Sequence, residues 1–282
     1  MKHNFYDILR STSIEPYELY QNLVTLFFKE TEVIRVDPLW TQSYSLYSWI
    51  EEDFRQFPYK KCSISLKEFN DRTGFQNLEC TPYGEYESQV NALISLCEYV
   101  LNFLTYIPFS SELKSKRKIT LDYIDEIINE LHLVKTQMKD GIYIITHANP
   151  VIEAVSAVVE EDIAISLVEY THHSMEGNIE NKKRILCSLA KKLETKRDSL
   201  NKIARDLVET FFCGVNNLDI RHDNTTLGCK NFNQNTVSLS NKELEEVYDR
   251  LFRLGLTLFL ILESKDNLGV IKNLSSRKNR KY

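Results

Sequence analysis

The sequence predicts a mainly α-helical protein whose helices pack as a bundle. Glycine and proline are scarce, with 8 and 6 residues among 282, whereas an all-β sandwich would need many tight turns. Most segments repeat apolar residues at three- and four-residue spacing, as one face of a helix does. The chain is 43% hydrophobic and 27% charged, a balance typical of water-soluble globular domains. We therefore expect long helices with few breaks.

Apolar periodicity predicts the helices of the first half in order. One helix is expected over residues 16–30 and a second over 44–57. The periodicity fails at 57–86, where glycines and prolines cluster, so we expect an irregular connector there with a short helix within it. A long helix follows over 85–107 and ends at a proline. Its apolar stripe is wide, which predicts a central position.

The middle of the chain begins with a polar, basic segment at 110–118, which we interpret as a boundary between regions. An amphipathic helix is predicted over 120–138, and the β-branched run at 142–145 is the best strand candidate. A strand alone cannot make a sheet. An Asn followed by Pro then predicts the start of a helix over 149–170.

The last part of the chain predicts a helical bundle interrupted by one long polar loop. Helices are expected over 179–193 and 200–214, and Ser240 with Glu243 forms a capping box that opens the last helix. The loop at 216–239 is rich in Asn and Asp. Because helices in bundles are usually joined by about two to eight residues, a loop of this length indicates a function.

These patterns divide the chain into an N-terminal helical region (1–110), a helical domain (119–263) and a flexible basic tail (264–282). The net charge of −5 excludes nucleic-acid binding by bulk electrostatics, so any such contact should be local and sensitive to salt. We interpret the basic tail as a solvated segment that aids solubility.

Targeting and cofactor motifs are not found. The six cysteines form no C-x-x-C pair and are expected to be reduced, and the N-terminus lacks the apolar run of a signal peptide. The longest apolar stretch, 254–262, is shorter than the about 20 residues that span a bilayer. The chain also lacks the glycine-rich, nucleophile and H-E-x-x-H motifs of common enzymes. We expect a cytoplasmic protein with no membrane partner, no cofactor and no metal.

The polar loop contains the best candidate for catalytic chemistry. His222 can take or give a proton near neutral pH, and Arg221 beside it can hold a phosphate. Asn216 or Asn217 would orient the substrate. Attack of a ribose 2′-hydroxyl on its neighbouring phosphate needs only these groups. We also assign substrate contacts to four further polar residues: Asp219, Asn224, His172 and His173.

A structural interpretation of the same loop remains open. Asn and Asp side chains often satisfy the hydrogen bonds of turns and helix ends. Under this interpretation Arg221 pairs with Asp219 or Asp223, and His222 is simply exposed.

His172 and His173 form a second polar cluster. Adjacent histidines on a helix point about 100° apart, so they do not chelate one metal as an i, i+4 pair does. Gly177 resembles a helix stop, and the end of a helix favours a protonated imidazole. The helix dipole is therefore an alternative explanation to a substrate contact.

The run NNLDIRHDN (216–224), between the last helices of an α bundle, resembles the HEPN superfamily (higher eukaryotes and prokaryotes nucleotide-binding). Ribonucleases of that superfamily carry an arginine followed, after four to six residues, by a histidine. Together with YTHHSMEGNIENK (170–182), the run looks like the C-terminal region of bacterial abortive-infection-type proteins related to HEPN. The resemblance covers about residues 141–263 and leaves the first 110 unexplained.

This resemblance implies a metal-independent endoribonuclease that works as a homodimer, in phage defence or as the toxin of a toxin-antitoxin pair. RNA, with transfer RNA as one candidate, would be the substrate, and an antitoxin or defence-system protein a partner. In this chain Asn216 or Asn217 stands where the arginine is usual, and Arg221 directly precedes His222. Either Arg221 supplies the cation from a shifted position, or the chain is a non-catalytic binding or regulatory relative.

Overall fold

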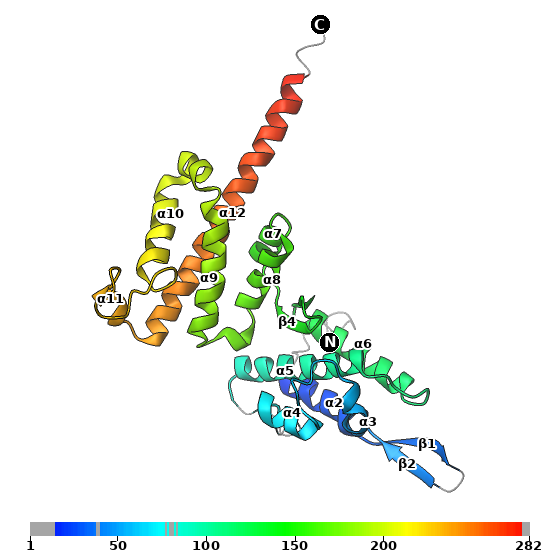
Figure 1. Cartoon of the computed structure of the whole chain (residues 1–282). Helices are drawn as coiled ribbons and strands as arrows, with labels where there is room; N and C mark the ends of the chain where they lie inside the picture. The colour runs from blue at the N-terminus through cyan, green and yellow to red at the C-terminus, as the bar shows by residue number, and fades with distance from the viewer. Residues whose placement is uncertain (1–14, 38–39, 77, 79–81, 83, 278–282) are drawn as a thin grey trace, which may run out of the picture. The chain divides into compact units, whose positions relative to one another are not determined.

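The computed structural model describes residues 15–37, 40–76, 78, 82 and 84–277. The fold is mainly α-helical, as the sequence predicts (Figure 1). Two compact units divide the chain, Met1–His147 and Ala148–Tyr282. Over the described residues, no helix combines the length and the apolar character that crossing a membrane would require.

The N-terminal unit is built around one long buried helix. This helix, α5 (Tyr86–Tyr106), buries most of its apolar residues and packs against α2, α6 and β4, which confirms its predicted central position. The other helices described in this unit are α2 (Pro16–Phe28), α3 (Leu46–Asp53), η1 (Phe54–Gln56), α4 (Leu66–Thr73) and α6 (Lys114–Glu130). Helix α4 is the short helix expected within the irregular connector.

Two antiparallel hairpins complete this unit. One joins β1 (Thr31–Asp37) to β2 (Trp40–Tyr44) and has no counterpart in the sequence prediction. The other joins β3 (Leu133–Gln137) to β4 (Tyr143–His147), the predicted strand. The helix expected over 120–138 is therefore wrong in its last part. It ends at Glu130 because the backbone turns at His132, whose φ is +52°, before β3 begins.

The division between the units falls after β4 rather than in the segment 110–118. Residues 114–118 instead begin helix α6. Strand β4 belongs to the first unit because α5 side chains bind its backbone: the amide of Asn102 pairs with Tyr143 N–H and C=O at 2.8 and 2.9 Å. In addition, the N–H of Ile145 donates to the Glu98 carboxylate at 2.5 Å. Long-range hydrogen bonds of this kind leave no signal in local composition.

The C-terminal unit is a helical bundle with the long loop before its last helix. Its elements are α7 (Pro150–Ser156), α8 (Glu161–Tyr170), η2 (His173–Met175), α9 (Ile179–Glu194), α10 (Arg197–Asn217), α11 (Gln234–Val237) and α12 (Asn241–Arg277). The single helix expected over 149–170 is two helices, because the chain breaks at 157–160. The tail expected to be flexible is helical as far as Arg277, since α12 continues through it. Residues 278–282 lie outside the described residues.

Close packing of α10 against α12 fixes where the loop starts. A Cβ atom on Gly214 would lie 2.6 Å from the side chain of Leu251, so a larger residue here would force Leu251 to move. The predicted capping box opens α12, because the Glu243 carboxylate accepts from both the N–H and the hydroxyl of Ser240, at 2.9 and 2.7 Å. Both ends of the loop are thus attached to well-packed helices.

A polar cluster joins α8, α9 and α12. Lys182 on α9 is buried and pairs with Glu245 at 2.7 Å and Asp249 at 2.8 Å on α12. The hydroxyl of Tyr170 at the end of α8 donates to Asp249 at 2.9 Å. Burial raises the pKa of Glu245, but hydrogen bonds from Lys182 and the Gly177 N–H outweigh it, so the pKa is lowered. The buried lysine thus has the partners that a buried charge requires.

Candidate functional site

The polar loop is attached to the bundle by buried hydrogen bonds near its start. The hydroxyl of the fully buried Tyr248 donates to the carbonyl of Leu218 at 2.8 Å. Asp219 follows with φ +59°, a left-handed conformation that Asp tolerates better than most residues. The chain therefore turns sharply at the exit from α10.

Asp219 and Asn224 then close the turn by reciprocal hydrogen bonds. The N–H of Asp219 donates to Asn224 Oδ1 at 2.8 Å, and the N–H of Asn224 donates to Asp219 Oδ1 at 3.0 Å. Asn224 is 1% exposed, and its amide also donates to the carbonyl of Asn231 at 2.6 Å. Asp219 Oδ2 accepts from Lys183 on α9 at 2.6 Å. These contacts attach the loop to the fold, whereas the sequence assigned both residues to substrate contacts.

Arg221 also points to the fold. Its guanidinium forms an ion pair with Glu194 at the end of α9, rather than with Asp219 or Asp223 as the structural interpretation expected. The hydrogen bond from Arg221 lowers the pKa of Glu194, and the same bond raises the pKa of Arg221. Glu194 lies 27 residues from Arg221 along the chain, so neighbouring sequence could not identify this partner.

Asp223 forms a local turn on the exposed side of the loop. Its Oδ1 accepts from the N–H groups of Thr225 at 3.1 Å and Thr226 at 2.9 Å. Hydrogen bonds from Thr226 lower the pKa of Asp223 to about 2. Burial and the neighbouring carboxylate raise the pKa of the Cys229 thiol, whose sulfur lies 3.6 Å from Asp223. Asp223 is thus a turn-forming carboxylate, as the structural interpretation expected for an Asp in this loop.

A polar hollow of about 520 Å³ lies beside the exposed side of the loop. It gathers the end of α10, the His222 segment and the stretch leading into α11. Its lining residues are Asn216, Asn217, His222, Lys230, Asn231, Phe232, Asn233 and Gln234. The structure therefore brings together three of the predicted catalytic residues, Asn216, Asn217 and His222. Arg221, Asp219 and Asn224 are not among the residues that line it.

Hydrogen bonds hold the two sides of this hollow together. The carbonyl of Asn217 accepts from the hydroxyl of Thr236 at 2.6 Å and from the amide of Asn233 at 3.2 Å. The Asn217 amide itself donates to the carbonyl of Cys213 one turn earlier on α10, at 2.8 Å. Asn216 Oδ1 is buried and has no hydrogen-bond partner among the described residues. Asn216 as a residue belongs to the hollow wall, although this oxygen itself is closed off from solvent.

Lys230 and Phe232 are site candidates that sequence reasoning missed. Lys230 is exposed and is the cationic member of the lining, and Phe232 supplies a half-buried aromatic ring. The sequence signal was the run Lys-Asn-Phe-Asn at 230–233, a cation and an aromatic residue among amides.

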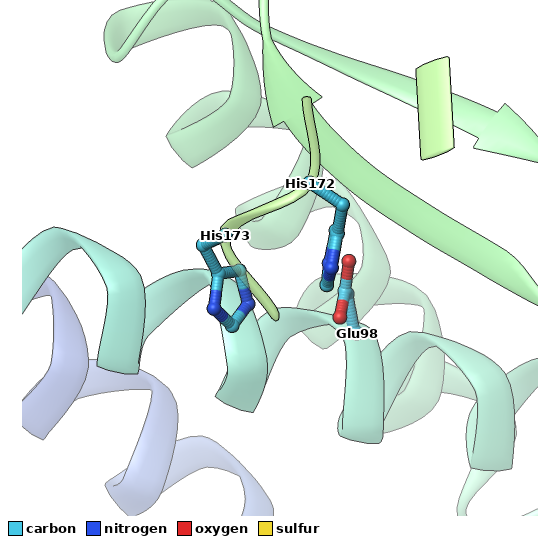
Figure 2. A group of neighbouring side chains, drawn as sticks. All are labelled: Glu98, His172 and His173. Carbon is cyan, nitrogen blue, oxygen red and sulfur yellow. The ribbon is translucent and has the colours of Figure 1, made fainter. Parts of the chain in front are cut away.

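His172 and His173 lie apart from the hollow lining, in the segment that follows α8 (Figure 2). Their ring centroids are 4.3 Å apart. His172 Nδ1 accepts from the N–H of Ser174 at 3.2 Å and so caps the short helix η2. Helix α8 ends at Tyr170, where the apolar periodicity predicted the end, so these histidines follow the helix rather than forming its last turn, and Gly177 is not its stop. Figure 2 also draws Glu98, a residue of the N-terminal unit.

Comparison of the chain with models of protein families, with curated proteins and with solved structures found no match. Within each unit taken alone, the described residues contain no cluster of three His, Cys, Asp or Glu side chains that could hold a metal ion.

Proposed function

We propose that the C-terminal unit is a HEPN-like, metal-independent endoribonuclease that acts in phage defence or as the toxin of a toxin-antitoxin pair. One observation carries the proposal: His222 lines the same hollow as Asn216, Asn217 and Lys230. An imidazole, amide donors and a cation are the groups that cleavage of a phosphodiester requires. The ring of Phe232 adds a surface on which a base can stack.

The proposed reaction is an intramolecular transfer at phosphorus. His222 removes the proton of a ribose 2′-hydroxyl, and the resulting oxygen attacks the neighbouring phosphorus. The bond from phosphorus to the 5′ oxygen breaks, and that oxygen takes a proton from the protonated imidazole. The products are a 2′,3′-cyclic phosphate and a free 5′-hydroxyl. Amides of Asn216 and Asn217 orient the phosphate.

In this proposal Lys230, rather than Arg221, supplies the positive charge that neutralises the phosphate. Arg221 is bound to Glu194, whereas Lys230 is exposed at the hollow. A lysine acts as a point charge rather than a planar fork, so it can neutralise a phosphate without fixing its orientation. The surrounding amides would supply that orientation.

The second candidate is a non-catalytic binding or regulatory protein of a defence system. The observation that favours it is the ion pair of Arg221 with Glu194, because this arginine then contributes to the fold. Under this proposal the polar hollow beside the loop binds RNA or a partner protein, such as an antitoxin, and leaves RNA intact.

Cleavage of transfer RNA and total RNA in the presence of EDTA tests the first proposal. We expect His222→Ala to slow cleavage about 100-fold or more, as removal of a general base does. Lys230→Gln should slow it about tenfold, because one charged contact to the phosphate is lost. Lys242→Gln is the matched control, since this exposed lysine of α12 is not part of the hollow lining, and it should cleave normally.

The absence of cleavage by the wild-type protein at every salt concentration would contradict the nuclease proposal. Binding of RNA without cleavage, weakened by His222→Ala and Lys230→Gln, would support the second candidate instead.

We also propose that the protein acts as a homodimer, in which two hollows complete one site. Light scattering that gives a monomer at micromolar concentration would contradict this part.

A further inference from the structure

A second hollow, in the N-terminal unit, has a lining that differs from the first. It has a volume of about 470 Å³ and lies where α5 ends and α6 begins. Its lining residues are Thr105, Tyr106, Ile107, Pro108, Phe109, Lys114 and Arg117. Two of these side chains are cationic, two are aromatic and none is acidic. This combination favours an anionic ligand that also has an apolar surface.

The aromatic walls of this hollow are fixed by their own contacts. The hydroxyl of Tyr106 donates to the carbonyl of Gly141. The ring of Tyr59 packs edge-on against the ring of Tyr106, with the ring centroids 5.0 Å apart. The ring of Phe109 stacks on that of Trp49, with the ring centroids 6.5 Å apart. The indole N–H of Trp49 donates to the carbonyl of Pro108 at 2.9 Å. A ligand would therefore meet walls that need little ordering when it binds.

The two cations lie one turn apart on α6. Arg117 is half-buried, and its Nε donates to the carbonyl of Leu104 at 2.7 Å, which fixes the guanidinium at the end of α5. Lys114 is exposed at the first position of α6. Among the described residues, neither side chain has an ion pair within 4.0 Å. Glu112 is the nearest acid along the chain; hydrogen bonds from its own backbone and from neighbouring serines, and the charge of Lys114, lower its pKa.

We propose that this hollow binds a small molecule that carries both a phosphate group and an aromatic ring, such as a mononucleotide. The phosphate would lie between Arg117 and Lys114, because two cations suit a doubly charged group better than a single carboxylate. The aromatic ring would pack on Tyr106 or Phe109. A volume of about 470 Å³ falls in the range of small-molecule sites, which a mononucleotide fits.

Calorimetric titration of the full chain with adenosine monophosphate tests this site. We expect the nucleotide to bind more tightly than either adenosine or inorganic phosphate, because each of these probes lacks one of the two groups. Lys114→Gln should weaken binding of the nucleotide several-fold, and Arg117→Gln should weaken it about tenfold or more. Lys118→Gln, at an exposed lysine of α6 outside the lining, should bind as the wild type does.

Arg117→Gln also removes the hydrogen bond to the carbonyl of Leu104, so circular dichroism must show that this variant is folded. Lys114→Gln tests the same phosphate contact without removing a hydrogen bond of the fold. Equal binding of the nucleotide by Lys114→Gln and Lys118→Gln would overturn the proposal. So would the lack of binding at millimolar nucleotide, or binding of a single-stranded oligonucleotide at this site in preference to the mononucleotide. RNA cleavage is measured separately with the His222 variant, so failure of one proposal does not decide the other.

Discussion

Side chains of the polar loop between α10 and α12 serve two different purposes. Those of Asp219, Arg221 and Asn224 contact α9 or the backbone of the loop, and we call them the anchoring face. Those of His222 and Lys230 line the polar hollow together with Asn217 of α10, and we call these three the hollow face. Arg221 and His222 are neighbours in sequence but lie on different faces. A charged residue beside a candidate base is therefore not necessarily part of its site.

The largest effect on stability is expected for Asn224→Ala, on the anchoring face. The change leaves the N–H of Asp219 and the carbonyl of Asn231 without their partners in a partly buried turn. Since each unsatisfied buried group costs about 1–3 kcal/mol, we expect the free energy of unfolding to fall by about 2–4 kcal/mol. Urea unfolding followed by circular dichroism measures it.

Asn235→Ala is the matched control for this change. Asn235 is exposed in α11, so its replacement should alter the free energy of unfolding by less than about 0.5 kcal/mol. An equal, small effect of both replacements would show that the hydrogen bonds of Asn224 do not stabilise the anchoring face.

A smaller effect is expected for Tyr248→Phe. The hydroxyl of Tyr248 donates to Leu218 at the exit from α10, and the ring stays buried in the variant. Loss of this one hydrogen bond should lower the free energy of unfolding by about 1 kcal/mol. Thermal unfolding measures the change, and a variant as stable as the wild type would show that this contact does not hold the start of the loop.

The smallest effect concerns the pH dependence of the turn at Asp223. Its folded pKa of about 2 lies below the ordinary value of 3.8, so the charged form is favoured in the folded protein. The stabilisation it gives is therefore present above pH 3.8 and is lost as the pH falls toward 2. A carboxyl-carbon titration by NMR should give a midpoint near 2 for Asp223, and Thr226→Val should raise it. A midpoint near 3.8 in the wild-type protein would contradict this account.

Local sequence predicted the elements that local forces determine. The periodicity of α5 and the capping box of Ser240 and Glu243 were sufficient to place these helices. The helix predicted through residue 138 was wrong because its last part pairs with β4, a contact that helical periodicity cannot show. A tertiary contact of this kind overrides the local preference of a segment.

For the candidate site, too, the sequence predicted the local part but not the long-range contacts. Asn216, Asn217 and His222 were identified because they lie close together in sequence, and the structure places them at one hollow. The position of Arg221 depends on Glu194, a residue of another helix, and the inclusion of Lys230 depends on how the loop returns toward α10. Neither long-range contact leaves a signal in the neighbouring residues.

The most direct test of the two faces compares Arg221→Gln with His222→Ala in RNA cleavage and in urea unfolding. We predict that Arg221→Gln cleaves at close to the wild-type rate and loses at most about 1 kcal/mol of stability, as a partly exposed ion pair would. His222→Ala should unfold as the wild type does and cleave about 100-fold more slowly or worse. A folded Arg221→Gln protein that cleaves as poorly as His222→Ala would contradict the account.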